Sequence, residues 1–239
     1  MQPRTTIYPT RDLLMAGAAD GLVAAAGQAI AERGRWRWVL AGGSTPEAVY
    51  RLLAQAPRRE QIDWARVQVW WGDERCVPPD DHDSNFGMAR RALLDHVAIP
   101  ASNIHRMRGE LLPAEAAQEY SAQMRAAFGN DGAWPIFDTI LLGIGNDGHT
   151  ASLFPASDIL GRSDVAVAAT WVAKLNAHRI SLTYPTINAA RDTIFLVAGA
   201  DKAPIVQAIL GGTGNEYPAA QVANARWLLD AAAGESRKP

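Results

Sequence analysis

Apolar residues recur along the chain in two alternating patterns, one with helical spacing and one of short β-branched or aromatic runs. The first helical pattern has its apolar face between Met15 and Ile30, and Thr10 and Gly34 stand where a cap and a terminator belong. The runs and the later helical patterns follow in turn. They predict strands at residues 36–41, 67–71, 136–142 and 193–198, with helices near 84–95, 114–128 and 202–210.

This alternation predicts an α/β fold with a mainly parallel central sheet and helices on both faces, in a doubly wound, Rossmann-like arrangement. Residues 165–171 and 179–183 are expected to add small strands at one edge. No repeat or linker interrupts the pattern, so residues 1–239 are expected to form a single domain. Ligands of such sheets bind at the carboxyl ends of the strands, and the informative side chains should therefore follow strands directly.

Composition and charge exclude several classes of protein. Apolar residues make up 48% of the chain and the net charge is -2, so neither a nucleic acid nor a membrane is an expected partner. The pairs Arg58-Arg59 and Arg90-Arg91 are interpreted as solvated helix faces. We find no signal-peptide pattern and no run approaching the roughly 18 apolar residues of a membrane span, and we expect a cytoplasmic protein.

The single cysteine, Cys76, excludes an intrachain disulfide. Because Arg75 lies beside it, a catalytic thiol is conceivable, but a buried small residue is the preferred interpretation.

A glycine-rich segment, Gly42-Gly43-Ser44-Thr45-Pro46, joins the first strand to a helix. Its glycines would let the backbone approach a ligand, and free N–H groups at the helix start would suit a phosphate. Ser44 or Thr45 is expected to cap the helix, with Pro46 in its first position. The Gly-Lys-Ser/Thr ending of a P-loop is missing. A tight turn without a ligand would show the same pattern, so both interpretations remain open.

Three consecutive charged residues, Asp73, Glu74 and Arg75, follow the second strand. Taken alone, this pattern favours a solvated turn over a site. Asp83-Ser84-Asn85 comes shortly afterwards and is placed to cap the next helix.

Residues 143–148, in the loop after the third predicted strand, literally match the dinucleotide fingerprint G-x-G-x-x-G. Its context is wrong, however, because His149 follows at once and Pro155 allows only a short helix. The acidic residue expected about 20 positions later could only be Asp164, which follows no strand. We therefore do not expect a nicotinamide cofactor.

The same loop carries Asp147 and His149 two residues apart at a strand end. Histidine suits proton transfer to or from water, and a nearby carboxylate could orient its ring. No third ligand has convincing spacing for a metal, and no nucleophile elbow surrounds Ser152.

Two cations follow downstream. Arg179 enters a strand, and Lys202 is expected in the first turn of a helix capped by Asp201. A cation at that position opposes the helix dipole unless an anion lies close. A bound phosphate would remove the conflict, and a simple surface lysine remains the alternative.

Taken together, these motifs resemble the 6-phosphogluconolactonase family, in order and across nearly the whole chain. The related glucosamine-6-phosphate deaminases share the Gly-Ser-Thr-Pro and Asp-Gly-His features, but they typically have Met-Asp-Glu-Tyr in the second motif and an acidic, Asn-containing continuation after the histidine. This chain lacks the Lys-Pro-Pro-rich stretch that lactonases usually carry before the arginine. The matching segments are Leu40-Ala-Gly-Gly-Ser-Thr-Pro46, Trp71-Gly-Asp-Glu-Arg75, Asp83-Ser-Asn85, the segment 142–155, Arg179-Ile-Ser-Leu-Thr183, Phe195-Leu-Val-Ala-Gly199 and Asp201-Lys-Ala203.

The resemblance implies hydrolysis of 6-phospho-D-glucono-1,5-lactone, a small-molecule sugar-phosphate lactone, without a metal or organic cofactor. It implies His149 as general acid and base, Asp147 or Asp73 as the orienting carboxylate, and Arg75 near the oxyanion or the phosphate. The phosphate would be held by Gly42, Gly43, Ser44 and Thr45 with Arg179 and Lys202. Lys174 has no assigned role.

Two other functions stay open at this point, an isomerising deaminase of amino-sugar phosphates and a non-catalytic sugar-phosphate sensor. Sensors usually carry a fused DNA-binding segment, and no helix-turn-helix pattern is visible here. The sequence leaves the oligomeric state open, and it is compatible with a monomer.

Overall fold

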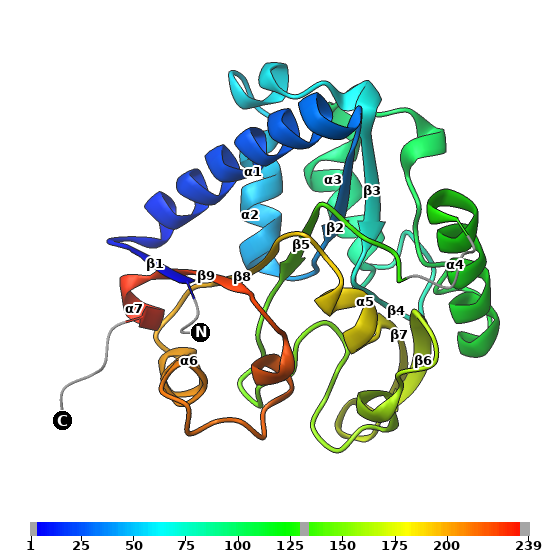
Figure 1. Cartoon of the computed structure of the whole chain (residues 1–239), viewed down its shortest axis with the longest axis vertical. Helices are drawn as coiled ribbons and strands as arrows, with labels where there is room; N and C mark the ends of the chain where they lie inside the picture. Colours follow the sequence, from blue (N-terminus) through cyan, green and yellow to red (C-terminus); the bar gives the residue numbers. More distant parts are fainter. Residues whose placement is uncertain (1–3, 130–133, 235–239) are drawn as a thin grey trace.

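The main sheet of the computed structural model, which describes residues 4–129 and 134–234, has six strands that all run parallel. Their spatial order is β1-β9-β8-β5-β2-β3 (Figure 1). The α/β prediction is therefore confirmed. The strands are β1 (Arg4–Tyr8), β2 (Trp36–Leu40), β3 (Val67–Trp71), β5 (Thr139–Leu142), β8 (Thr193–Val197) and β9 (Arg226–Asp230).

A second, smaller sheet contains β4 (Asp73–Arg75), β7 (Ala177–Leu182) and β6 (Val167–Val172), all antiparallel. The two extra strands expected from the sequence do form. They pair with each other and with β4, however, in a sheet of their own instead of extending the main one. Strand β4 follows β3 after Gly72 and carries the charged turn into this second sheet.

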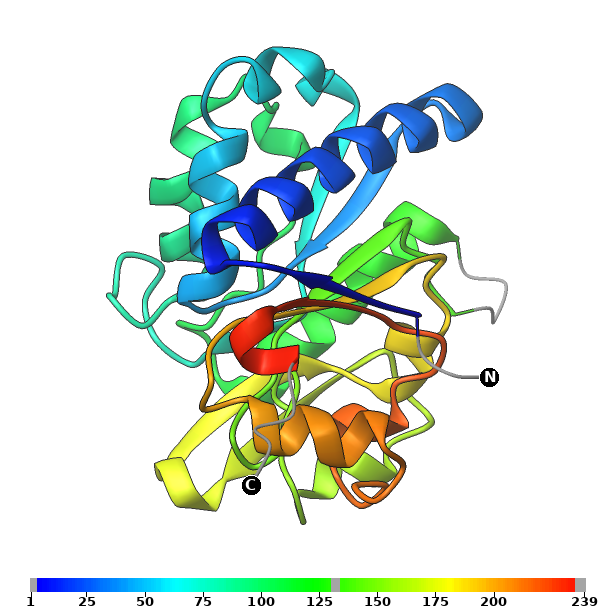
Figure 2. The same ribbon diagram turned by 90° about the vertical axis from the view of Figure 1, so that its left-hand side faces the viewer.

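Helices cover both faces of the main sheet (Figure 2). Alternate residues of each strand point to opposite faces, so Val39 and Trp70 enter one buried cluster while Trp38 and Trp71 enter the other. Helices α1, α2 and α3 pack on the second of these faces, and α4, α5, α6 and the small sheet pack on the first. The α-helices are α1 (Arg11–Arg33), α2 (Ser44–Leu53), α3 (Asn85–Ala92), α4 (Pro113–Phe128), α5 (Tyr184–Asn188), α6 (Ala203–Leu210) and α7 (Ala231–Gly234). Short 3₁₀ turns lie at Arg58–Gln61, Trp64–Arg66, Leu94–His96, Ala101–Asn103, Asp158–Gly161, Ala173–Leu175 and Pro218–Gln221.

Several helix ends follow the sequence signals. The hydroxyl of Thr10 accepts the N–H of Leu13 at 3.2 Å, Gly34 ends α1 in the left-handed conformation, and Ser84 caps α3 through the N–H of Gly87. Two expected caps are wrong. Gly43, without a side chain, is the cap residue of α2, because the helix starts at Ser44, two residues earlier than Pro46 suggested.

The second wrong cap is at α6, where the cap position belongs to Lys202 instead of Asp201. Both displaced caps lie in loops that follow a strand of the main sheet. Neither helix start has the side-chain cap hydrogen bond that is usual at this position.

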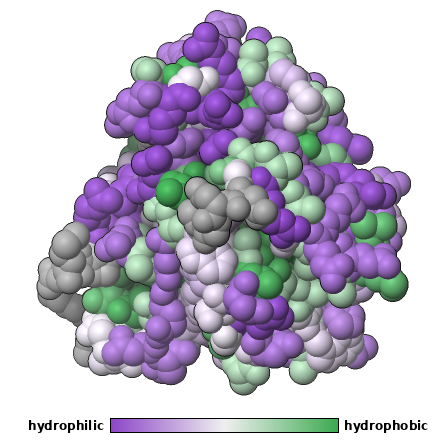
Figure 3. All heavy atoms as spheres, turned by 45° about the vertical axis from the view of Figure 1, so that its right-hand side comes forward, coloured by the Kyte–Doolittle hydropathy of each residue, from purple (hydrophilic) through white to green (hydrophobic). Residues whose placement is uncertain are grey.

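Helix α1 is long and apolar enough to cross a membrane by length and composition, contrary to our reading of the sequence. It packs against α2 and the strands β2 and β9, and residues such as Leu14, Ala18 and Leu22 are buried there. On the face drawn in Figure 3, hydrophilic residues dominate and apolar ones form small separate patches. One face of α1 is thus buried in the core, as expected for a helix that packs on a sheet.

The connection order reverses beside β2. The chain passes from β2 to its neighbour β3, and then returns to β5 on the other side of β2. In open parallel sheets such a reversal opens a crevice between the loops that leave the two adjacent strands. Here these loops are residues 41–43 after β2 and residues 143–149 after β5, which places the glycine-rich segment beside the histidine loop.

Candidate active site

A cavity of about 330 Å³ lies at this crevice, at the carboxyl ends of the parallel strands. The loops after β2, β3, β5 and β8 all contribute to its wall. It therefore brings together segments that are more than 150 residues apart in sequence. The polar and glycine residues in its wall are Gly42, Gly43, Ser44, Thr45, Gly72, Asp73, Arg75, Asn85, Gly143, Gly145, His149 and Lys202.

The imidazole of His149 is held on two sides. Its Nδ1 lies 2.5 Å from Oδ1 of Asp147, and its ring stacks on Phe154 with a centroid distance of 4.0 Å. Nε2 has no hydrogen-bond partner among residues 4–129 and 134–234, so it is the nitrogen available for a reacting molecule. Asp147 itself does not line the cavity and acts from behind the ring.

Gly145 explains why this loop needs glycine where the fingerprint suggested a nucleotide. A Cβ at this position would lie 2.1 Å from two atoms of the His149 ring. The N–H of Gly145 donates to the carbonyl of His149 at 2.9 Å, which closes the loop into a tight turn. The glycine thus allows the ring to lie against its own backbone.

Burial lowers the pKa of His149, and the hydrogen bond and charge of Asp147 oppose this shift only in part. Burial also works to raise the pKa of Asp147, but hydrogen bonds from Lys174 and His149 outweigh it and bring the value down to about 2. At neutral pH the pair is therefore a carboxylate beside a neutral imidazole. An imidazole in that state accepts a proton at Nε2 while Nδ1–H donates to the carboxylate.

Lys174 completes this arrangement from the turn between β6 and β7. Its ammonium donates to Oδ2 of Asp147 and lies 4.7 Å from the centroid of the Phe154 ring. Lys174 had no predicted role, since no spacing in the sequence connects a residue of the small sheet with the loop after β5. Contact across the two sheets is a tertiary feature that local pattern does not encode.

Asp73, at the start of β4, lines the cavity and is held by two side chains. Oδ2 accepts the hydroxyl of Ser152 at 2.7 Å, and Nδ2 of Asn85 donates to the Asp73 carbonyl at 2.9 Å. Asn85 also lies so close to Gly42 that a Cβ there would be 1.9 Å from Oδ1 of the amide. Asp73 influences His149 only as the weakest of the charges and hydrogen bonds that shift its pKa.

Glu74 is a structural carboxylate that the sequence analysis did not distinguish from its neighbours. Its side chain is buried and accepts the backbone N–H groups of Arg75, Asn85 and Phe86 at 2.7–2.8 Å. Burial raises its pKa to about 7, although these N–H groups favour the ionised form. Glu74 thus fixes the start of α3 against β4 and keeps Asn85 beside Asp73. The N–H groups at a helix start attract a carboxylate. The cap predicted at Asp83-Ser84-Asn85 was therefore the sequence signal that could have pointed to Glu74.

The glycine-rich segment has the uncapped helix start that an anion site requires. Gly43 has φ of +100°, and residues 44 and 45 begin α2 without any side-chain cap on their N–H groups. Ser44 and Thr45 line the cavity, so these free N–H groups face the same space as His149.

The three candidate cations are placed differently. Arg75 and Lys202 line the cavity, whereas Arg179 does not. Arg179 pairs with Arg75 across β7 and β4, and burial followed by the charge of Arg75 lowers its pKa. Lys202 donates to the Asn146 side chain and lies 3.4 Å from Asp201.

Two alternatives from the sequence can be assessed here. Burial raises the pKa of Cys76 to about 11, which disfavours a catalytic thiolate at this position. Within the described part of the chain, the group with metal-ligand spacing is Asp81-His82-Asp83, which lies outside the cavity and is largely exposed.

Comparison with known proteins places these residues in a family context. The family model for glucosamine-6-phosphate isomerases/6-phosphogluconolactonase matches residues 9–229. A 6-phosphogluconolactonase of Nostoc sp. is 39% identical over 241 residues, and the match covers 98% of both chains. One from Mycobacterium tuberculosis is 42% identical over 243 residues and 96% of both chains.

Solved structures agree with this assignment. A 6-phosphogluconolactonase from Trypanosoma brucei superposes with a TM-score of 0.85 at 29% identity, over 97% of both chains. One from Thermotoga maritima gives 0.82 at 30% identity, over 95% of this chain and 100% of the other. A monomeric glucosamine-6-phosphate deaminase gives 0.79 at 21% identity over 96% of this chain and 98% of the other, which shows a shared fold alone.

Proposed function

Because this chain belongs to the glucosamine-6-phosphate isomerase/6-phosphogluconolactonase family, we propose that it hydrolyses 6-phospho-D-glucono-1,5-lactone to 6-phospho-D-gluconate. One observation carries the proposal beyond the family. A neutral histidine, backed by an ionised carboxylate, shares a cavity of about 330 Å³ with a helix start whose N–H groups are free. Such a cavity can hold a phosphate at one wall while a base acts at the other.

The chemical step needs a base and then an acid at the same place. Nε2 of His149 takes a proton from a water molecule, whose oxygen attacks C1 of the lactone. The resulting imidazolium is stabilised by Asp147 and returns the proton to the ring oxygen as the C1–O bond breaks. General acid–base catalysis of this kind contributes typically about 10²- to 10⁴-fold. No step calls for a metal or an organic cofactor.

Asp147 is the carboxylate that we propose orients His149, because it contacts Nδ1 directly. Asp73 then has a different task. Its carboxylate lines the cavity beside Arg75 and is fixed by Ser152, so we assign it to positioning the substrate or the attacking water. Lys174 keeps Asp147 ionised and holds its second oxygen away from the reaction.

The phosphate would lie at the start of α2, against the N–H groups of Gly43, Ser44 and Thr45, with Lys202 as its charged partner. Lys202 suits this task because its nearest partner is the neutral amide of Asn146, and its ion pair with Asp201 is long at 3.4 Å. Arg75 would meet the oxyanion that develops at C1. Arg179 lies beside Arg75 because the two residues are paired between β4 and β7. Its charge raises the positive electrostatic potential of the site.

The direct test is a coupled assay with freshly prepared lactone, corrected for its spontaneous opening. We expect formation of 6-phosphogluconate well above the uncatalysed rate and no ammonia release from glucosamine 6-phosphate. Ammonia release without lactone hydrolysis would assign the deaminase reaction instead. Binding of sugar phosphates without either reaction would indicate a sensor. The cytoplasm is the compartment that we propose for the reaction, since the sugar phosphates concerned are metabolites of central carbohydrate metabolism.

A further inference from the structure

A second cavity, of about 360 Å³, lies at the amino-terminal edge of the main sheet, opposite the candidate active site. We call it the arginine cavity. The strands between the two cavities are about 17 Å long, as five residues at 3.3 Å each imply for β2. Its lining residues are Arg33, Arg35, Arg37, Phe128, Trp134, Ile136, Asp138 and Arg191.

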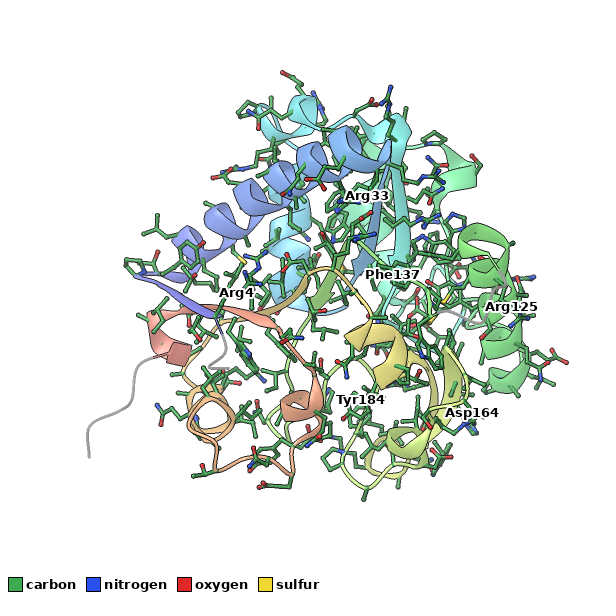
Figure 4. All side chains as sticks on the ribbon, in the orientation of Figure 1. Arg4, Arg33, Arg125, Phe137, Asp164 and Tyr184 are labelled. Carbon is green, nitrogen blue, oxygen red and sulfur yellow. The ribbon has the colours of Figure 1, made fainter. Side chains whose placement is uncertain are left out.

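A single carboxylate organises the arginine cavity. Asp138 immediately precedes β5 and is only 6% exposed at its side chain. Its oxygens accept Nε of Arg33 at 2.6 Å and the backbone N–H of Arg37 at 2.8 Å, and Nε of Arg191 lies 3.5 Å away. Figure 4 shows Arg33 at the end of α1, above Phe137, which adjoins Asp138. Asp138 therefore holds Arg33, Arg37 and Arg191 in place, and both of its oxygens already accept hydrogen bonds.

The positive charge of the cavity is not balanced. Arg33 has a second carboxylate partner in Glu32, whereas the guanidinium of Arg37 reaches neutral acceptors, Gln68 at 3.3 Å and the Ala127 carbonyl at 2.7 Å. Arg35 forms no hydrogen bond or ion pair with any residue that the structure describes. Among the described residues, four guanidinium groups therefore face two carboxylates, those of Glu32 and Asp138, on a chain whose net charge is -2.

An apolar wall adjoins these charges. Ile136 is 43% exposed although it is large and apolar, and Trp134 lies next to it in the cavity. The guanidinium of Arg37 lies over the ring of Phe128, with its Cζ 3.9 Å from the ring centroid. This stacking holds the planar cation against the apolar wall. Guanidinium groups match the oxygens of phosphate in pairs, and aromatic or aliphatic side chains bind the flat face of an organic group.

We propose that the arginine cavity binds a phosphate ester that carries at least two negative charges and a planar apolar group, such as a nucleoside diphosphate. Arg35, which has no ion pair with a described residue, and Arg191, whose 3.5 Å contact with Asp138 is longer than that of Arg33, would take the phosphates. Trp134 and Ile136 would cover the planar group. This site is separate from the candidate active site, because the two cavities share no lining residue.

Isothermal titration of the intact chain with ADP tests the proposal, with adenosine as the uncharged probe. We expect ADP to bind and adenosine to bind far more weakly. Arg35→Gln combined with Arg191→Gln should weaken ADP binding by at least about tenfold. Arg51→Gln combined with Arg59→Gln removes the same two charges from exposed ion pairs that line neither cavity and should leave ADP binding unchanged.

Two controls keep the test decisive. Arg35→Gln alone removes no hydrogen bond or ion pair with the described residues, so it should fold normally and still weaken ADP binding. Saturation with 6-phosphogluconate should not displace ADP. The proposal is overturned if ADP does not bind, if 6-phosphogluconate competes with it, or if the Arg35 and Arg191 variants bind ADP like the unmodified chain.

Discussion

Nδ1 of His149 and Oδ1 of Asp147 lie 2.5 Å apart, on two residues of one tight turn. The contact orients the ring and fixes its tautomer, so the open nitrogen is Nε2. Because Lys174 engages the other oxygen of Asp147, the carboxylate stays charged while it supports the histidine. The turn therefore supplies a base whose protonation state is set by three side chains from two sheets.

Replacing Asp147 by Asn keeps the size of the side chain and removes its charge. The imidazolium formed during the reaction loses its counter-charge, so we expect kcat to fall by about 10²- to 10⁴-fold. Steady-state kinetics with corrected background should show KM nearly unchanged, since Asp147 does not line the cavity. A rise in KM by a similar factor, with normal kcat, would argue against an orienting role.

Activity should fall as the pH is lowered, because only neutral His149 can accept a proton. Burial lowers the pKa of His149 below its usual 6.5, so kcat/KM should stay level near neutrality and decline with a midpoint below pH 6.5. The charge of Lys174 contributes to the lowered pKa. The variant Lys174→Met should therefore shift the acid limb of the profile to higher pH.

Lys174→Arg is the matched control for this profile, since it retains the cation and the donor. Its acid limb should lie near that of the unmodified chain. If Lys174→Met and Lys174→Arg shift the limb equally, the effect comes from the packing on Phe154 and not from charge.

Gly145→Ala tests whether the glycine is required by the histidine ring. The new methyl group would lie 2.1 Å from the ring and must displace it, and a displacement of about 1 Å can cost roughly 10²-fold in rate. Gly161→Ala is the matched control, because nothing lies within 4 Å of its added Cβ. Kinetics of both variants, with melting temperatures, should show a loss of kcat confined to Gly145→Ala.

Glu74 should make stability depend on pH. Burial raises its pKa from 4.5 to about 7, so its contribution to folding is fully present below pH 4.5 and is lost as the pH rises through 7. The difference corresponds to about 3 kcal/mol. Urea unfolding at pH 5 and pH 8 should show that Glu74→Gln loses less stability between these values than the unmodified chain does.

The exposed carboxylate Glu60 provides the control for this measurement, as Glu60→Gln removes a charge without changing a buried group. Its unfolding free energy should follow that of the unmodified chain at both pH values. The same pH dependence in Glu74→Gln as in the unmodified chain would show that Glu74 is not responsible.

Much of the fold could be predicted from periodicity. The run at residues 67–71 forms β3 with the predicted bounds. It is a short β-branched and aromatic run between Arg66 and Gly72, a pattern that strongly favours a strand. Strand β1 was missed because its residues are mostly exposed, so its sequence lacks the apolar run that indicates a buried strand. The two small strands were expected at one edge of the main sheet and instead form a sheet of their own with β4, because strand pairing partners are a long-range choice that alternation does not encode.

The candidate site was predictable where chemistry is local. His149 and Asp147 share one turn, and the free helix start follows two glycines, so both were visible as patterns. Lys174 is 27 residues from Asp147 in sequence and Ser152 is 79 residues from Asp73, so only tertiary packing brings each pair together. Arg179 looked equivalent to Arg75 in sequence, yet the ladder places it outside the cavity wall.

The most direct test of the account is the turnover of fresh 6-phosphogluconolactone by His149→Ala, measured beside titration of the same variant with 6-phosphogluconate. If His149 is the proton acceptor, kcat should fall by about 10²- to 10⁴-fold while product binding stays within a few-fold, since the phosphate is held elsewhere. Near-normal turnover by His149→Ala, after correction for spontaneous opening, would contradict the account.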